Sequence, residues 1–120
     1  MNFENLVSDA IDHIPAQYQD KMKHVAIIVD DEPSPEQRAR LGLRSCDALF
    51  GLYEGVPLTK RGGNLLQIPP DIITIFKHPM IDIFTDEKSL KTQIYKTLWH
   101  EVAHFFGLNH TQIHQAQNKK

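Results

Sequence analysis

The stretch HEVAHFFGLNH, residues His100–His110, places three histidines and one glutamate within eleven residues. His100 and His104 are one helical turn apart, so a helix brings their imidazoles to one face, about 5 to 6 Å apart at the backbone end. Glu101 is offset by only about 60° from His104 around such a helix. Gly107 can take the left-handed conformation that ends a helix and turns the chain. The spacing predicts a helix that stops at Gly107 and a third histidine, His110, that returns toward the first two.

This arrangement of histidines is suited to a zinc ion. Two ring nitrogens at the predicted separation can both reach zinc at about 2.0 to 2.1 Å. We therefore predict His100, His104 and His110 as zinc ligands. Three neutral imidazoles leave a fourth position open for water, which is typical of catalytic rather than structural zinc. Glu101 is predicted beside the metal, where it can hold a water molecule without becoming a ligand.

Other interpretations of the same residues remain open. A zinc site that only stabilises the fold suits a small domain, and histidines also occur on helices as hydrogen-bonded surface groups. His114 is also available to bind the metal, but we interpret it as part of a polar tail over about residues 111–120. Tyr53 and Tyr95 carry hydroxyl groups able to stabilise a developing oxyanion. Neither tyrosine is assigned this role.

Length and composition restrict the fold and the partners. A chain of 120 residues is about one domain long, so we expect a single domain over residues 1–120. Hydrophobic residues make up 41% and charged residues 23%, which are near globular averages and exclude wholesale disorder. The net charge of -2 provides no basic field for phosphate backbones, so no nucleic-acid partner is expected. Cys46 is the single cysteine, so neither an intrachain disulfide nor a cysteine metal cluster is possible.

Targeting signals are not evident in the sequence. The N-terminal residues include Glu4, Asp9 and Asp12, whereas a secretory signal needs a basic start and an unbroken apolar run. No stretch approaches the roughly 20 apolar residues that span a bilayer. We therefore expect a cytoplasmic protein without a membrane partner. The oligomeric state is not encoded in any pattern that we recognise.

The order of the predicted elements comes from apolar periodicity and helix punctuation. Apolar residues at three- and four-residue steps predict a first helix from Phe3 to Ile14, ended by Pro15. Three short apolar runs predict strands, and two capping patterns predict further helices. The predicted strands are 25–29, 48–55 and 71–76; the predicted helices are 35–41, with Ser34 as N-cap, and a long last helix from Thr85 or Asp86 to Gly107.

These elements give an order of helix, strand, helix, strand, strand, helix. That order predicts an α+β fold in which helices pack on a small, mostly antiparallel or mixed sheet of about three to four strands. Prolines and paired glycines between Val56 and Pro70 predict a long irregular loop. The apolar piece Met80–Phe84, which follows Pro79, is assigned to no element.

The sequence resembles the small bacterial zincin-like metallopeptidases, a minimal metzincin-like family. His100, Glu101, His104, Gly107 and His110 match every fixed position of the metzincin signature HExxHxxGxxH. The softer similarities are LFGLYEGVPL and the ITIF strand followed by a proline. The resemblance covers about residues 25–110 and implies a zincin-like fold with the long C-terminal helix carrying the metal.

The resemblance also implies an activity. It makes Glu101 the general base of a zinc-dependent metallopeptidase that cleaves peptides or flexible protein segments. Substrates of such enzymes usually lie antiparallel to an edge strand, which the resemblance places at Asp71–Phe76. One departure is that no methionine follows His110, where metzincins have a methionine turn beneath the metal. We interpret Met80, the upstream alternative, as a core residue.

Two other functions are compatible with the motif. A non-catalytic interaction module stabilised by zinc would use the same histidines and would not need Glu101. An RNA-acting metal hydrolase is a further alternative, since small endoribonuclease-like proteins have the related pattern HGxxHxxGxxH. Those proteins have glycine at the position of Glu101, and an acidic chain is poorly suited to RNA.

Overall fold

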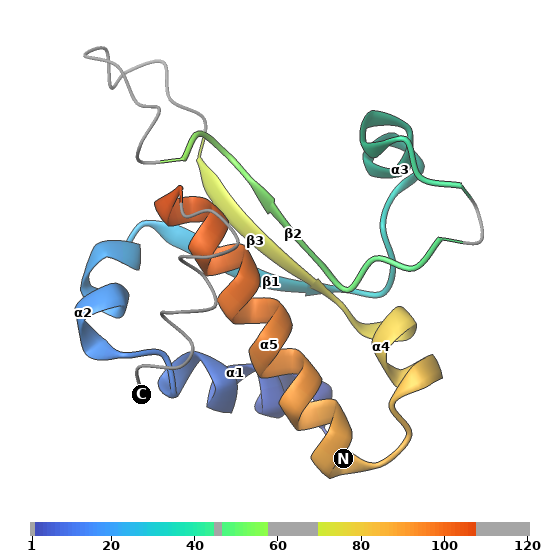
Figure 1. Cartoon of the computed structure of the whole chain (residues 1–120), viewed down its shortest axis with the longest axis horizontal. Coiled ribbons are helices and arrows are strands. Elements are labelled where there is room, and N and C mark those ends of the chain that lie inside the picture. The colour runs from blue at the N-terminus through green and yellow to red at the C-terminus, as the bar shows by residue number, and fades with distance from the viewer. Residues whose placement is uncertain (1, 45–46, 58–69, 108–120) are drawn as a thin grey trace.

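Helices pack against a small mixed sheet in this α+β chain (Figure 1). The computed structural model describes residues 2–44, 47–57 and 70–107. Its elements, in chain order, are α1 (Phe3–Asp12), α2 (Ala16–Gln19), η1 (Asp20–Met22), β1 (Val25–Asp30), α3 (Pro35–Leu41), β2 (Gly51–Glu54), β3 (Asp71–Phe76), α4 (Lys77–Ile83) and α5 (Glu87–Phe106). The predicted fold class, with a mixed sheet of three strands and a long last helix, is confirmed.

The three strands have the order β1-β3-β2. β1 runs parallel to β3, with Val25 opposite Asp71, whereas β2 runs antiparallel to β3, with Tyr53 opposite Ile73. The amide of Phe76 donates to the carbonyl of Phe50 at 2.9 Å. Because antiparallel pairs alternate in their hydrogen bonding, the main-chain groups of Gly51 and Tyr53 point away from β3.

The hydrophobic core lies between the sheet and two helices. α5 contacts both β2 and β3 and packs against α1. Ile73 and Ile75 of β3 are fully buried, and one stripe of α5 is buried with them: Leu90, Ile94, Leu98, Val102 and Phe105. Each such side chain contributes roughly 1.5 to 3 kcal/mol when it is removed from water. This packing fixes the position of α5 relative to β2, and the candidate site lies between these two elements.

The predicted helix signals of α3 and α5 are confirmed. Ser34 and Gln37 form a capping box at the start of α3, and Gly42 ends this helix with a left-handed φ of 70°. Asp86 accepts a hydrogen bond from the amide of Ser89 at 2.9 Å and thereby caps α5. Gly107 ends α5 with a φ of 76°. The two glycines adopt a conformation that L-residues with a side chain rarely take.

Two segments without a predicted element are helical. Residues after Pro15 form α2 and η1, where Gln19 Nε2 donates to the carbonyls of Ile11 and Ile14 and ties this turn to α1. The apolar piece Met80–Phe84 mostly belongs to α4, and Pro79 lies in the first turn of this helix. Proline is tolerated there because an amide in the first turn has no partner within the helix. Met80 is fully buried in the core, as interpreted from the sequence.

The prediction that Asp71–Phe76 is an edge strand is wrong. This segment forms β3, the central strand, which is paired on both sides and therefore uses its main-chain groups within the sheet. Among the described strands, β2 is the outer strand that contacts α5. Strand β2 is also shorter than the predicted 48–55 segment.

Parts of two predictions lie outside the described residues. These are most of the loop between Val56 and Pro70 and the segment after Gly107, including His110 and His114. Among the helices that the structure describes, none is both long and apolar enough to cross a membrane.

Candidate metal centre

Two of the three predicted ligands come together on the last turns of α5. His100 Nε2 and His104 Nε2 are 3.0 Å apart, and the two rings meet edge to face with centroids 4.6 Å apart. Ligand atoms of His100, Glu101 and His104 all lie within 4.8 Å of one another. The helical spacing therefore produces the predicted convergence of side chains.

These residues fit a zinc ion. Two nitrogens that bind one tetrahedral zinc at about 2.0 to 2.1 Å are about 3.3 Å apart, so the observed 3.0 Å separation needs an adjustment of only a few tenths of an ångström. His104 is exposed and His100 is half-buried, so an ion can approach from solvent. Neutral imidazole is a preferred ligand of zinc.

Glu101 differs from the histidines because it is buried. Only 8% of its surface is exposed, and its Oε1 accepts a hydrogen bond from the backbone amide of Tyr53 at 2.9 Å. Burial raises the pKa of Glu101 from its ordinary 4.5 to about 7, and the Tyr53 hydrogen bond lowers this pKa in part. A carboxyl group with a pKa near neutrality is suited to accept and release a proton at physiological pH.

A glycine allows β2 to approach α5 beside this carboxylate. A Cβ atom on Gly51 would lie 2.6 Å from Thr97 Cγ2 and 3.3 Å from Glu101 Cγ. Any residue with a side chain at position 51 would therefore require the Thr97 side chain, the strand or the helix to move. The sequence signal was the glycine at the start of GLYE, because glycine in a strand often marks a close backbone approach.

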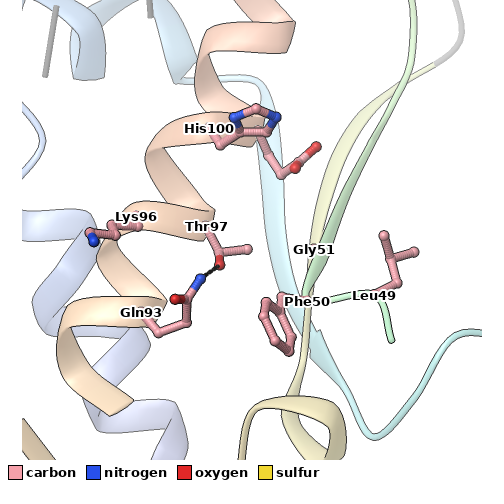
Figure 2. A pocket seen from close by; sticks show the side chains of 8 residues that line it. Leu49, Phe50, Gly51, Gln93, Lys96, Thr97 and His100 are labelled. Carbon is pink, nitrogen blue, oxygen red and sulfur yellow. Dashed lines mark hydrogen bonds between the residues drawn. The ribbon is translucent and has the colours of Figure 1, made fainter. Parts of the chain in front are cut away.

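A cleft of about 520 Å³ opens between β2 and α5 next to His100 and Glu101. Figure 2 shows Gln93 and Thr97 on α5, joined by a hydrogen bond of 2.9 Å, with the ring of Phe50 on the facing segment. One wall is apolar and the other is polar; together they consist of Leu49, Phe50, Gly51, Gln93, Lys96, Thr97, His100 and Glu101. Its volume is within the range of small-ligand sites.

The family model for the zincin-like metallopeptidases matches residues 22–119, which is most of the chain. This protein belongs to the zincin-like metallopeptidase family. The match includes the whole of α5 and the segment that carries the remaining motif residues. Family membership implies a zinc-binding fold, and the His100, Glu101 and His104 group could hold a metal ion.

A solved structure has a similar fold. A conserved hypothetical protein from Thermo thermophilus superposes with a TM-score of 0.57 at 17% sequence identity, over 88% of this chain and 91% of the other. At this identity the similarity shows the fold alone. No curated protein matches the sequence.

The structure places the predicted residues of this zincin-like chain as follows. His100 and His104 lie together with Glu101, whereas the third predicted ligand, His110, lies outside the described residues. The hydroxyl of Tyr53, considered as an oxyanion donor, instead donates to Asp71 Oδ1 at 2.7 Å. Phe50 and Gln93 were not predicted as cleft residues: Gln93 belongs to no motif, and the motif LFGLYEGVPL, which contains Phe50, assigned that residue no role.

Proposed function

We propose that this protein is a zinc-dependent hydrolase that cleaves peptide bonds in peptides or flexible protein segments. In this proposal His100, His104 and His110 hold the zinc ion, and Glu101 is the general base. The observation that carries it is a buried carboxylate beside two converging imidazoles and at the end of a cleft. A metal site that only stabilises the fold does not need such a carboxylate.

Zinc, when bound, supplies a Lewis acid and brings the pKa of its water to about 7. Glu101 provides the base: its carboxylate accepts a proton from the attacking water and delivers it to the leaving amine. Without the metal, burial raises the pKa of Glu101 to about 7, and a bound cation would lower this pKa and favour the carboxylate form that accepts the proton. The Tyr53 amide donates to Glu101 Oε1, and in this proposal Oε2 is the oxygen that acts on the attacking water.

The proposed substrate follows from the same geometry. β2 takes the place that the resemblance assigned to Asp71–Phe76, because it is the outer strand of the described sheet and contacts the metal helix. A peptide in extended conformation beside β2 would present its side chains to the cleft of about 520 Å³. The cleft is open and suits a flexible segment better than a folded surface.

The experiment compares the wild type with Glu101→Gln and His104→Ala. Zinc content is measured by mass spectrometry and turnover is measured with a fluorogenic peptide library. We expect wild type and Glu101→Gln to bind one zinc ion each, and His104→Ala to bind it weakly. Glu101→Gln should cleave about 10² to 10⁴ times more slowly than wild type, as is typical when a general base is removed.

Two results would contradict the proposal. If Glu101→Gln cleaves as fast as wild type, Glu101 is not the base. If zinc-loaded wild type cleaves no peptide in the library, the chain is a zinc-stabilised binding module instead. An RNA digestion in parallel covers the remaining alternative, for which cleavage should weaken steeply with added salt.

A further inference from the structure

Tyr53 connects the proposed base, Glu101, to the central strand β3 through one hydrogen bond from its main chain and one from its side chain. Its amide donates to Glu101 Oε1 at 2.9 Å, and its hydroxyl donates to Asp71 Oδ1 at 2.7 Å. Asp71 is buried, with 7% of its surface exposed, at the first position of the central strand. One residue of the outer strand thus contacts both the metal helix and β3.

Packing restricts Tyr53 as well. Its ring lies edge to face against Phe105, with centroids 6.0 Å apart, and Phe105 is one helical turn after Glu101 on α5. Gly55 closes over the hydroxyl end: a Cβ at this position would lie 2.6 Å from Asp71 Oδ1 and 2.8 Å from Tyr53 Oη. The φ of Gly55 is 150°, which L side chains rarely adopt. The Tyr53 and Asp71 pair is therefore enclosed by α5 on one side and by the chain after β2 on the other.

We propose that Tyr53 and Asp71 are positioning residues that set the orientation of the Glu101 carboxylate through the main chain of β2. The expected change in kcat rests on the proposed function, whereas the expected change in the hydrogen bond between the Tyr53 amide and Glu101 does not. Neither side chain touches the substrate in this proposal. The Asp71 bond holds the Tyr53 side chain, the side chain holds the backbone of β2, and the Tyr53 amide holds Glu101.

The physical reason is that the Glu101 side chain is long and flexible. A glutamate has three rotatable bonds, and the amide contact removes much of the freedom of the last one. β2 has only four residues, so its register beside α5 depends strongly on each anchor. When the Asp71 anchor is removed, β2 can shift by a fraction of an ångström and carry the Tyr53 amide with it. Shifts of this size at reacting groups can cost one to two orders of magnitude in rate.

The test uses Tyr53→Phe, Asp71→Ala and Asp71→Asn in the zinc-loaded full chain. Tyr53→Phe keeps the ring on Phe105 and removes only the hydroxyl. Asp71→Asn keeps a carbonyl oxygen that can accept the bond, whereas Asp71→Ala does not. We expect kcat to fall about tenfold in Tyr53→Phe and Asp71→Ala, with KM and zinc content unchanged, and Asp71→Asn to retain most of the parent's kcat.

A double variant and a matched control are also compared with the parent by their activity. Tyr53→Phe combined with Asp71→Ala should lose clearly less activity than the two single losses added together, since both changes remove the bond that joins the two side chains. Tyr18→Phe is the control, because Tyr18 also packs edge to face on aromatic residues of α5, Trp99 and Phe106, and has no part in the pair. Its kcat should equal that of the parent.

A second readout separates this inference from the proposed activity. The amide resonance of residue 53 in ¹⁵N–¹H spectra reports its hydrogen bond to Glu101, and Glu101→Ala defines the position without that bond. We expect the amide in Tyr53→Phe and Asp71→Ala to move toward that position, and the amide in Asp71→Asn to remain near the parent's. This holds even if the parent hydrolyses no peptide, in which case only the proposed function fails.

Two results would overturn the inference. One is an amide resonance of residue 53 that stays at the parent's position in both Tyr53→Phe and Asp71→Ala. The other is an equal loss of kcat in Asp71→Asn and Asp71→Ala, since the hydrogen bond would then not be what positions Glu101.

Discussion

Gly51 of β2 faces Thr97 of α5 so closely that a methyl group on the glycine would lie 2.6 Å from Thr97 Cγ2. Real Cβ atoms essentially never lie within 3.0 Å of such a neighbour, so Gly51→Ala must displace the Thr97 side chain, the strand or the helix. We expect Gly51→Ala to lower the free energy of unfolding by about 1 to 3 kcal/mol, as overpacked substitutions do. Urea denaturation followed by circular dichroism measures this change.

Thr97→Ser provides the matched control for this contact. Serine lacks the methyl group that clashes but keeps the oxygen that accepts from Gln93 Nε2. The cost of Gly51→Ala should therefore be clearly smaller in a Thr97→Ser background than in wild type. Equal costs in the two backgrounds would show that Thr97 is not what limits the approach of β2.

Gly107 is expected to influence both stability and zinc binding. Alanine at this position has to adopt a φ of 76°, so Gly107→Ala should destabilise the protein by about 1 kcal/mol. The proposed ligand His110 follows three residues later, and a change in the direction of the chain should also weaken zinc binding. Isothermal titration with zinc and thermal denaturation measure the two effects.

Gly42→Ala separates these effects. Gly42 ends α3 with a similar φ of 70°, and a Cβ there would meet nothing within 4 Å. Its substitution should have a similar cost in stability and leave the dissociation constant for zinc unchanged. If both variants bind zinc as wild type does, the turn at Gly107 does not direct the third ligand.

Local signals in the sequence were sufficient for the elements that carry the site. The apolar stripe of α5, its cap at Asp86 and its end at Gly107 all depend on residues within one helix, and they were predictable for that reason. The same applies to the convergence of His100 and His104, which follows from helical geometry alone. Ser34 and Gln37 likewise define the start of α3 within four residues.

Relationships between distant segments were not predictable in this way. The burial of nearly every residue of β3 is typical of a central strand, but its apolar run alone did not distinguish an edge from a centre. The hydrogen bond between Tyr53 and Glu101 joins residues 48 positions apart, and the cleft combines Phe50 with Gln93. α4 was missed because Pro79 indicates a boundary unless it lies in the first turn of a helix.

Phe50 is expected to influence the choice of peptide rather than the chemical step. Its half-buried ring forms the apolar wall of the cleft, opposite Gln93 and Thr97. Phe50→Ala should raise KM for peptides with aromatic or large aliphatic side chains near the cleaved bond by about tenfold, which corresponds to about 1.4 kcal/mol, with little change in kcat. Peptides with small side chains at the same position serve as the control. A uniform change in KM for both peptide sets would place the Phe50 ring outside the specificity site.

The buried carboxyl of Glu101 should make stability depend on pH in the zinc-free protein. Its pKa is raised from 4.5 to about 7, so between these pH values the folded chain keeps a proton that the unfolded chain has released. Stability therefore falls as pH rises through this window and levels off above about pH 7. At about 1.4 kcal/mol for each pKa unit, the loss is about 3 kcal/mol. Glu101→Gln cannot ionise but keeps an oxygen for the Tyr53 amide, and it should lack this loss. Urea denaturation of both proteins from about pH 4.5 to about pH 8 measures the difference, and parallel curves would mean that Glu101 ionises in the fold as easily as in water.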